Sequence, residues 1–397
     1  MRLPRGFVAS GVRAGIRKKR PDLALFVAES GATCAAIFTT NRFRAAPVVL
    51  SESALRRSGG KVRAVVVNSG CANAITGRAG IQAAREVRRK TAQLLESPED
   101  EILLASTGVI GTPLPKAAIR SALPDAMARL SPYGIEAASH AILTTDVGPK
   151  VVRTAFTWNG RRCSLVGVAK GAGMIHPRMA TMLAFLMTDA SASPAFLKQV
   201  LRESAAQSFN AISVDGDTST NDSVFLMTSN RVASSNAKAS HAGERDAASF
   251  RRALNTVCRK LAWMIVRDGE GASRVLDVEV RGARSERDAR VVAQVIGTSP
   301  LVKTAIHGGD PNWGRFLAAL GRSGVRFSAR HLALRFGRVT IVENGSLTSY
   351  RERDAARVFA RERVPVVIEL GTGRASANLL VSDLGHDYVS LNSAYRS

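Results

Sequence analysis

The stretch KGAGMIHPRMATMLAFLMTDA, Lys170–Ala190, constrains this chain more than any other, because it leads a glycine-rich approach into a long apolar run. Gly171 and Gly173 allow backbone angles that other residues avoid, and Pro177 fixes a bend. A peptide bond that follows such a bend can be held under strain. The apolar run MATMLAFLM has the length of a buried strand or a helix segment.

A hydroxyl nucleophile, Thr181, follows the small residue Ala180 at this point of the chain. Its hydroxyl could attack the Ala180 carbonyl and form an ester that water resolves, leaving chains 1–180 and 181–397. The new α-amino group of Thr181, with a pKa of roughly 7.7 to 8.0, would then serve as a base for its own hydroxyl. A buried threonine of a strand or helix explains the segment equally well, so other parts of the chain must decide.

Ordered motifs along nearly the whole chain decide between these readings. They are PDLALF (21–26), FTTNRFRAAPV (38–48), NSGCANAITG (68–77), STGVIG (106–111), ILTTD (142–146), SFNAISVDGDTSTNDS (208–223), RDGEGASR (267–274), GGDPNWGR (308–315) and HDYVSLNSAYRS at the C-terminus. Together with the Thr181 segment, they closely resemble the ornithine acetyltransferase family, also called bifunctional glutamate N-acetyltransferase/amino-acid acetyltransferase, of arginine biosynthesis. Any one short glycine-rich piece would be weak evidence, whereas this order excludes chance.

The resemblance implies the fold and the activity. It implies an α/β fold in which paired β-sheets are sandwiched by helices, in the manner of N-terminal-nucleophile enzymes, followed by a smaller α/β domain. It also implies a self-processing enzyme that moves acetyl from N2-acetyl-L-ornithine to L-glutamate through an acetyl-Thr181 ester. The cleaved halves would assemble as α2β2. No cofactor is implied, and these residues leave open whether acetyl-CoA also serves as an acetyl donor.

The resemblance also implies the site residues. Acyl transfer needs donors for the developing oxyanion, and the family's positions for them are Thr107 and Gly108. An ordinary turn after the strand EILLA is the alternative for that motif. Substrate would be bound by Thr144, Lys170, Thr181, Glu270, Asn392 and Ser397. From charge alone, Lys170 suits a carboxylate and Glu270 an ammonium. Both lie in glycine-bounded loops, where side chains often serve binding.

Two residues depart from the family pattern. Arg178 stands where the family usually has Asn, which adds charge beside the scissile bond, and Ser397 stands where Thr is more usual. Neither the acidic segment 213–222 nor the histidines indicate a metal. The segment lacks the glycine placement and terminal Glu of a calcium loop, so its carboxylates are expected to cap turns around the nucleophile. His176 is expected to stabilise a turn or to assist proton transfer.

Composition indicates a globular enzyme. The 397 residues are 45% hydrophobic and 22% charged, enough for a large core. There is no signal-peptide h-region and no apolar run of the ~20 residues that span a membrane, so we expect a cytoplasmic protein. Cys34, Cys71, Cys163 and Cys258 are far apart in the sequence and are expected to be reduced and mostly buried.

The net charge of +24 is not needed by an enzyme for small amino acids. Most of the excess is arginine in scattered short clusters, and only 5% of residues are aromatic. Nucleic-acid binders more often concentrate charge and interleave aromatic residues, so we expect solvated surface arginines and no specific nucleic-acid partner.

Apolar periodicity predicts alternating strands and helices, which is typical of α/β proteins. The sequence predicts a strand at 62–70, helices at 80–95, 197–209 and 247–266, an exposed loop at 229–247, and strands again from 273 onward. We therefore expect a catalytic domain at 1–272 and a smaller domain at 273–397. Two other function classes stay open: a related self-cleaving amidase or aminopeptidase, and a non-catalytic basic scaffold.

Overall fold

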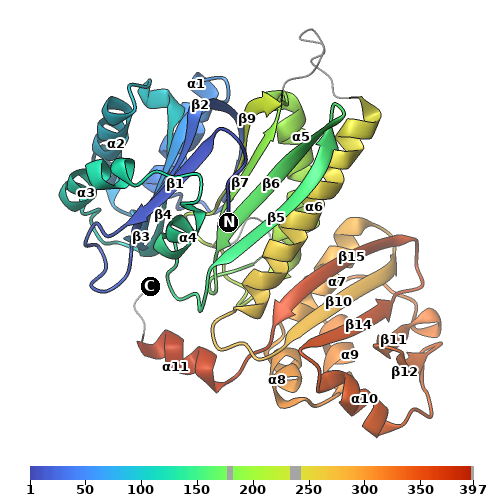
Figure 1. Cartoon of the computed structure of the whole chain (residues 1–397). Helices are drawn as coiled ribbons and strands as arrows, with labels where there is room; N and C mark the ends of the chain where they lie inside the picture. Colours follow the sequence, from blue (N-terminus) through green and yellow to red (C-terminus); the bar gives the residue numbers. More distant parts are fainter. Residues whose placement is uncertain (177–181, 233–242, 395–397) are drawn as a thin grey trace.

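The computed structural model describes residues 1–176, 182–232 and 243–394. Within these ranges the strands form two sheets, each flanked by helices (Figure 1), so the predicted α/β class is confirmed. None of the described helices is long and apolar enough to cross a bilayer. All four cysteines are buried free thiols, as expected.

The first sheet contains eight of the described strands. They are β1 (Phe7–Val12), β2 (Leu23–Phe38), β3 (Lys61–Cys71), β4 (Ile102–Val109), β5 (Lys150–Trp158), β6 (Arg161–Lys170), β7 (Leu183–Ala190) and β9 (Ser223–Val232). The order is β4-β3-β2-β9-β7-β6-β5, with β1 paired to the free edge of the first half of β2. Its helices are α1 (Ala46–Arg57), α2 (Gly77–Leu94), α3 (Lys116–Ala128), α4 (Ile135–Ala141), α5 (Pro194–Ala206) and α6 (Glu244–Arg267).

This sheet folds back on itself through the long strand β2. The register between β2 and β3 shifts between Val27 and Ala32, and Gly31 has a φ of +80° at the bend. As a result Phe26, from the first half of β2, stacks on Phe185 of β7 with ring centroids 4.6 Å apart. One apolar core fills the space between the two halves, and two further cores lie under the outer helices. The predicted paired layers between helices are therefore confirmed, as two halves of one hydrogen-bonded sheet.

The apolar run that follows the glycine-rich segment forms β7, which lies inside the first sheet between β9 and β6. Every residue of β7 is buried, since β7 pairs with β6 and β9 and is covered on both faces. The outer face is covered by α6, whose Phe250, Leu254, Val257 and Leu261 recur at helical spacing. In Figure 1, α6 runs along β5 and β6.

The second sheet has seven of the described strands, in the order β13-β12-β11-β14-β10-β15-β8. They are β8 (Ile212–Ser213), β10 (Val275–Ala283), β11 (Ala333–Phe336), β12 (Val339–Glu343), β13 (Ser346–Leu347), β14 (Arg363–Glu369) and β15 (Ala375–Ser382). Its helices are α7 (Glu286–Gly297), α8 (Pro300–Gly308), α9 (Trp313–Gly321) and α10 (Glu352–Phe359), and α11 (His386–Ala394) follows β15. This sheet has its own core.

The elements predicted from periodicity are present with shifted ends. The helix expected at 197–209 begins at Pro194, where the Ser193 hydroxyl accepts from the Phe196 N–H at 3.3 Å, and it ends at Ala206. The loop expected at 229–247 starts later, because β9 continues to Val232 and α6 begins at Glu244. The division at 272/273 falls between α6 and β10 and remains a prediction, since β8 from the earlier part of the chain joins the second sheet.

Candidate active site

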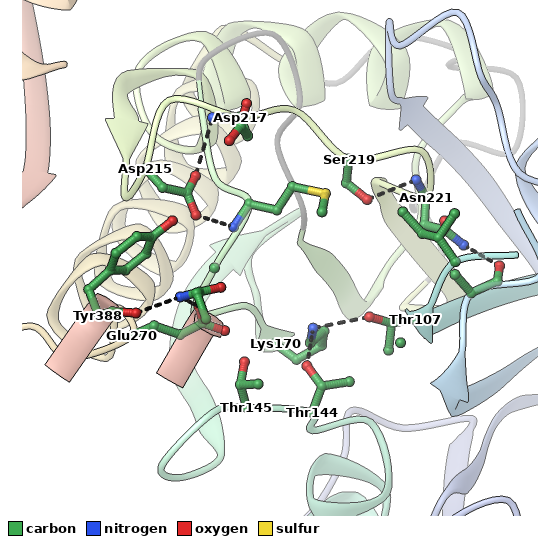
Figure 2. Close-up of a pocket in the computed structure, with 16 residues that line it drawn as sticks. Thr107, Thr144, Thr145, Lys170, Asp215, Asp217, Ser219, Asn221, Glu270 and Tyr388 are labelled. Atoms are coloured by element: carbon green, nitrogen blue, oxygen red, sulfur yellow. Dashed lines mark hydrogen bonds between the residues drawn. The ribbon is translucent and has the colours of Figure 1, made fainter. Parts of the chain in front are cut away.

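Six residues expected at the site from the sequence line one pocket of about 200 Å³ (Figure 2). They come from distant parts of the chain: Thr107, Gly108, Thr144, Lys170, Glu270 and Asn392. The remaining expected residues, Ala180, Thr181 and Ser397, lie outside the described residues, as does Arg178. The first described residue after Thr181 is Met182, which directly precedes β7.

The first wall of the pocket is the end of β4. Thr107 and Gly108 lie within this strand, so the alternative of a turn after EILLA is wrong. The register with β3 shifts here, because Cys71 pairs with both Thr107 and Val109. Gly108 has a φ of +128°, and a Cβ at this position would lie 2.4 Å from the Gly70 carbonyl carbon. Only glycine fits this strained approach to β3.

Lys170, at the end of β6, carries the positive charge of the pocket. Its side chain is only 3% exposed, and its ammonium donates to the Thr144 hydroxyl at 2.8 Å and the Thr107 hydroxyl at 3.1 Å. Burial lowers the pKa of Lys170, an effect that the nearby Asp146 carboxylate opposes. Because an ammonium has three N–H donors, these two hydrogen bonds leave one donor for an anionic group in the pocket.

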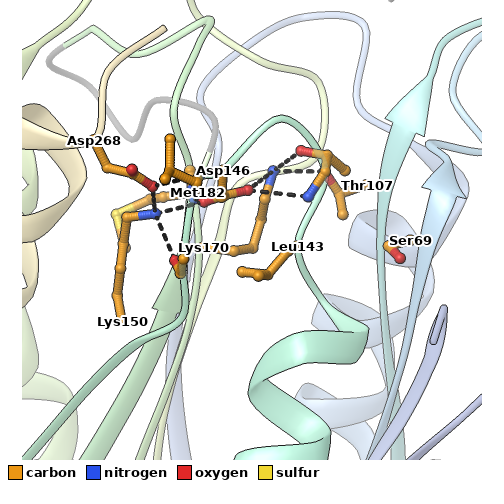
Figure 3. Close-up of polar contacts among 12 residues, drawn as sticks. Ser69, Thr107, Leu143, Asp146, Lys150, Lys170, Met182 and Asp268 are labelled. Carbon is orange, nitrogen blue, oxygen red and sulfur yellow. Dashed lines mark hydrogen bonds and ion pairs between the residues drawn. The ribbon is translucent and has the colours of Figure 1, made fainter. Parts of the chain in front are cut away.

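Asp146 lies behind Lys170 and is fully buried (Figure 3). Its carboxylate accepts hydrogen bonds from the Lys150 ammonium at 2.7 Å, the Gly171 N–H at 2.6 Å and the Thr144 N–H at 3.0 Å. Burial alone would raise the pKa of Asp146, but the charges of Lys170 and Lys150 outweigh it and hold the pKa below its ordinary value. Asp146 was not predicted as a site residue from the sequence, although it ends the motif ILTTD that supplies Thr144.

The opposite wall of the pocket is acidic. Glu270, Asp215 and Asp217 line it, and the Asn392 amide of α11 donates to Glu270 Oε2 at 2.9 Å. Gly173 makes room for Glu270, because a Cβ on Gly173 would lie 2.5 Å from Glu270 Oε2. The pocket therefore has a cationic end at Lys170 and an anionic end at Glu270.

Asp215 was expected to organise a turn, and it does so. Its carboxylate accepts from the backbone N–H groups of Met174, Ile175 and Asp217, and burial raises its pKa. It also lies in the pocket, together with Asp217 and Tyr388, and none of these three was predicted as a site residue from the sequence. The sequence does contain a signal for the two aspartates, because Asp215 and Asp217 flank Gly216, much as Glu270 lies between two glycines. Burial, and then the charge of Asp215, raises the pKa of Tyr388.

Asp222 is a second buried carboxylate of the same acidic segment. Its Oδ1 accepts from the Met182 N–H at 2.9 Å, while Oδ2 is buried without a hydrogen-bond partner among the described residues. Burial raises its pKa well above the ordinary value. His176, the other residue considered for this region, places Nδ1 3.2 Å from the Ser213 hydroxyl. Within the described ranges, no three His, Cys, Asp or Glu side chains are placed to hold a metal ion.

Comparison with known proteins agrees with the sequence resemblance. The model of the ArgJ family matches residues 8–397. The arginine biosynthesis bifunctional protein ArgJ of Caldanaerobacter subterraneus subsp. tengcongensis is 44% identical over 399 residues, covering 100% of this chain and 98% of that protein. The protein of the same name from Chlorobaculum tepidum is 44% identical over 394 residues, covering 99% and 96%. Among solved structures, the arginine biosynthesis bifunctional protein argJ of Bacillus halodurans is similar, with 36% identity and a TM-score of 0.50, and the match covers 53% of this chain and 98% of that one.

Proposed function

The chain belongs to the ArgJ family, and from this premise we propose that it is an acetyltransferase of arginine biosynthesis. It transfers the acetyl group of N2-acetyl-L-ornithine to L-glutamate, giving ornithine and N-acetylglutamate. The family model and the identity to the relatives confirm the family resemblance seen in the sequence. We propose that the reaction uses no metal or cofactor. We also propose that the enzyme acts in the cytoplasm.

The opposite charges at the two ends of the pocket are the observation that supports this substrate class most directly. Acetylornithine carries a carboxylate and a side-chain ammonium. We assign the carboxylate to Lys170, with the Thr144 hydroxyl beside it, and the ammonium to Glu270. Charge-assisted hydrogen bonds of this kind are roughly twice as strong as neutral ones. Glutamate has a second carboxylate in place of the ammonium, for which the Ser219 hydroxyl, which accepts from the Asn221 N–H and keeps its own proton, offers a neutral donor.

The proposed mechanism uses one covalent carrier. Self-cleavage frees the α-amino group of Thr181, which takes the proton of its own hydroxyl as the oxygen attacks the acetyl carbonyl. The Thr107 hydroxyl and the Gly108 N–H stabilise the oxyanion. Ornithine leaves with a proton returned from the α-amino group, and the glutamate amine then attacks the acetyl ester. The processed chains 1–180 and 181–397 form one protomer, and we expect two protomers in the assembly.

Intact-mass analysis of the purified protein tests the nucleophile. We expect two chains split between Ala180 and Thr181 for the natural sequence and a single inactive chain for Thr181→Ala. Thr181→Ser keeps a hydroxyl and should retain some cleavage and some transfer. A split Thr181→Ala protein would exclude self-cleavage by this residue.

Initial-rate kinetics test the order of the reaction. A covalent acetyl carrier predicts parallel double-reciprocal plots against acetylornithine at several glutamate concentrations. Labelled acetyl should also remain on the chain that begins with Thr181 when glutamate is withheld. Release of labelled acetate at the same rate with and without glutamate would indicate an amidase instead. The same assay with acetyl-CoA in place of acetylornithine tests whether that donor also loads Thr181.

A further inference from the structure

Four charged side chains form a buried cluster behind the cationic end of the pocket (Figure 3). They are Asp146, Lys150 at the start of β5, Lys170 at the end of β6 and Asp268 after α6. The side chains of Asp146, Lys150 and Lys170 are 0%, 2% and 3% exposed, and Asp268 is 17% exposed. Of the four, only Lys170 lines the pocket.

Asp146 divides its two oxygens between the two lysines. Its Oδ1 accepts from the Lys150 ammonium at 2.7 Å, whereas its Oδ2 lies 3.9 Å from the Lys170 ammonium. The same carboxylate holds the backbone N–H groups of Gly171, next to Lys170, and of Thr144. Asp146 therefore fixes both the position of Lys170 and that of its hydroxyl partner.

Lys150 is held from the other side by Asp268. Its ammonium forms an ion pair with Asp268 Oδ2 and lies 3.4 Å from the Gly148 carbonyl oxygen. Asp268 Oδ2 also accepts from the Val147 N–H at 3.2 Å. Lys150 thus links Asp146, which lies behind Lys170, to Asp268, which precedes Glu270 by two residues in the chain. Both charged ends of the pocket are attached to this cluster.

Charges at these distances interact strongly, because burial removes the water that would screen them. Lys150 competes with Lys170 for the single charge of Asp146, and it also repels the Lys170 ammonium. Asp268 draws the Lys150 ammonium away from Asp146 and reduces that competition. The charged groups that act on Lys170 are Asp146, Lys150, Asp222 and Glu270, and its hydrogen-bonding neighbours Thr107 and Thr144 are neutral.

We propose that Lys150 is a positioning residue which, by sharing Asp146 with Lys170 and anchoring to Asp268, sets how strongly Lys170 holds its proton and thus the substrate carboxylate. The assignment of the carboxylate to Lys170 rests on the proposed function. A purely structural cluster would fix the 143–150 segment to the end of α6 and leave the protonation of Lys170 unaffected.

Charge removal on the two sides of Asp146 separates these roles, because the two changes act in opposite directions. Lys150→Met removes a like charge and leaves Asp146 to Lys170, so the pKa of Lys170 should rise. Asp146→Asn removes the countercharge, so the pKa should fall. In Asp268→Asn, Lys150 loses its second partner and pairs with Asp146 alone, so the pKa of Lys170 should fall slightly. This effect should disappear in the double variant Lys150→Met/Asp268→Asn. A change of about one unit is expected for a neighbouring buried charge.

The first readout is NMR titration of the lysine side chains in ¹³C-labelled protein, with the Lys170 signal assigned by its loss in Lys170→Arg. The second is the pH profile of kcat/KM for acetylornithine, whose alkaline limb should move to higher pH in Lys150→Met and to lower pH in Asp146→Asn. Lys198→Met, on the exposed face of α5, is the matched control and should move neither. Lys150→Arg keeps the charge and should restore the natural profile.

The two readouts distinguish the inference from the function on which it rests. If the Lys170 titration moves in opposite directions in Lys150→Met and Asp146→Asn but the natural protein does not transfer acetyl, the inference holds and the proposed function is wrong. If transfer is normal and Lys150→Met leaves the pKa of Lys170 unchanged or lowers it, the inference is overturned. Should Lys150→Met fail to fold, Asp268→Asn gives the same decision, since a folded Asp268→Asn protein with an unmoved Lys170 titration contradicts the role of Lys150.

Discussion

At the residue scale, the buried Thr107 hydroxyl accepts one hydrogen bond and keeps its own proton. It accepts from the Lys170 ammonium at 3.1 Å, so its own proton is free to point toward an oxyanion. Removing one preorganised donor usually costs 10² to 10³ in turnover. We therefore expect Thr107→Ala to lower kcat by about this factor with little change in substrate affinity, and Thr107→Ser to retain most activity.

Steady-state kinetics on purified variants, with single-turnover acetylation as a second measurement, check this expectation. Thr112→Ala, an exposed threonine just beyond the end of β4, is the control. A normal kcat in Thr107→Ala would remove this hydroxyl from the reaction.

Gly108 gives a prediction about stability. In Gly108→Ala the new Cβ would meet the backbone of Gly70 and Cys71, which side-chain rotation cannot relieve. Gly111 also has a positive φ, of +80°, but its Cβ would meet no atom within 4 Å. We expect about 1 kcal/mol of destabilisation for Gly111→Ala and about 3 kcal/mol for Gly108→Ala, measured by urea unfolding of matched samples. Equal losses would mean that β3 yields readily at this point.

At the scale of elements, α11 contributes to the pocket without contributing to the core. It supplies Tyr388 and Asn392 to the pocket, and its residues are exposed apart from Tyr388, which is partly buried. Its exposed face includes Val389 and Leu391. An element that fully buries no side chain adds little to the free energy of unfolding, while the Asn392 amide still holds Glu270.

Deleting residues 386–397 should therefore separate stability from activity. We expect the melting temperature to change by no more than about 3 °C and kcat/KM for acetylornithine to fall by a factor of roughly 10 to 10², the usual effect of losing hydrogen bonds to a charged group. Asn392→Ala should show a smaller loss in the same direction. A truncated protein with full activity would show that α11 does not serve the site.

The elements also show where sequence reasoning succeeds and where it stops. Helices such as α6 could be predicted because one apolar face repeats every 3.6 residues. The bend in β2 could not, because it depends on which strands pair with each half. Lys170 and Glu270 could be named from the family motif and their glycine-bounded loops. Asp146 ends the motif ILTTD, but its role and that of Lys150 could not be predicted, since they come from partners that the fold brings together through space.

At the scale of the whole molecule, the pocket depends on the junction between the two sheets. The short strand β8 pairs in parallel with β15 of the second sheet, with Leu380 opposite Ile212, and Asp215 of the pocket follows two residues after β8. Lys303 of α8 fastens this junction. Its buried ammonium donates to the carbonyl oxygens of Val214 and of Ser382, the latter at 2.6 Å.

Lys303 makes the stability of this junction dependent on pH. Burial lowers the pKa of Lys303 to about 8, against an ordinary value of roughly 10.4 in the unfolded chain. Between these values the unfolded state binds more protons than the folded state, so the contribution of Lys303 to stability rises as pH increases and is lost as pH falls toward 8. The neutral amine still donates both hydrogen bonds. At 1.36 kcal/mol per unit, the change over this window is on the order of 3 kcal/mol.

Urea unfolding of the natural protein and of Lys303→Met at several pH values from 7.5 to about 10.5 measures this contribution. Groups far from Lys303 contribute alike in both proteins, and its charged neighbours Asp215 and Asp383 are carboxylates that are ionised throughout this alkaline range, so the difference in unfolding free energy reports the Lys303 proton. We expect Lys303→Met to become progressively less stable than the natural protein as pH rises. Lys198→Met, which removes an exposed lysine, should show a constant difference. A constant difference for Lys303→Met as well would mean that the folded and unfolded states bind the Lys303 proton equally, which would contradict a pKa lowered by burial at this junction.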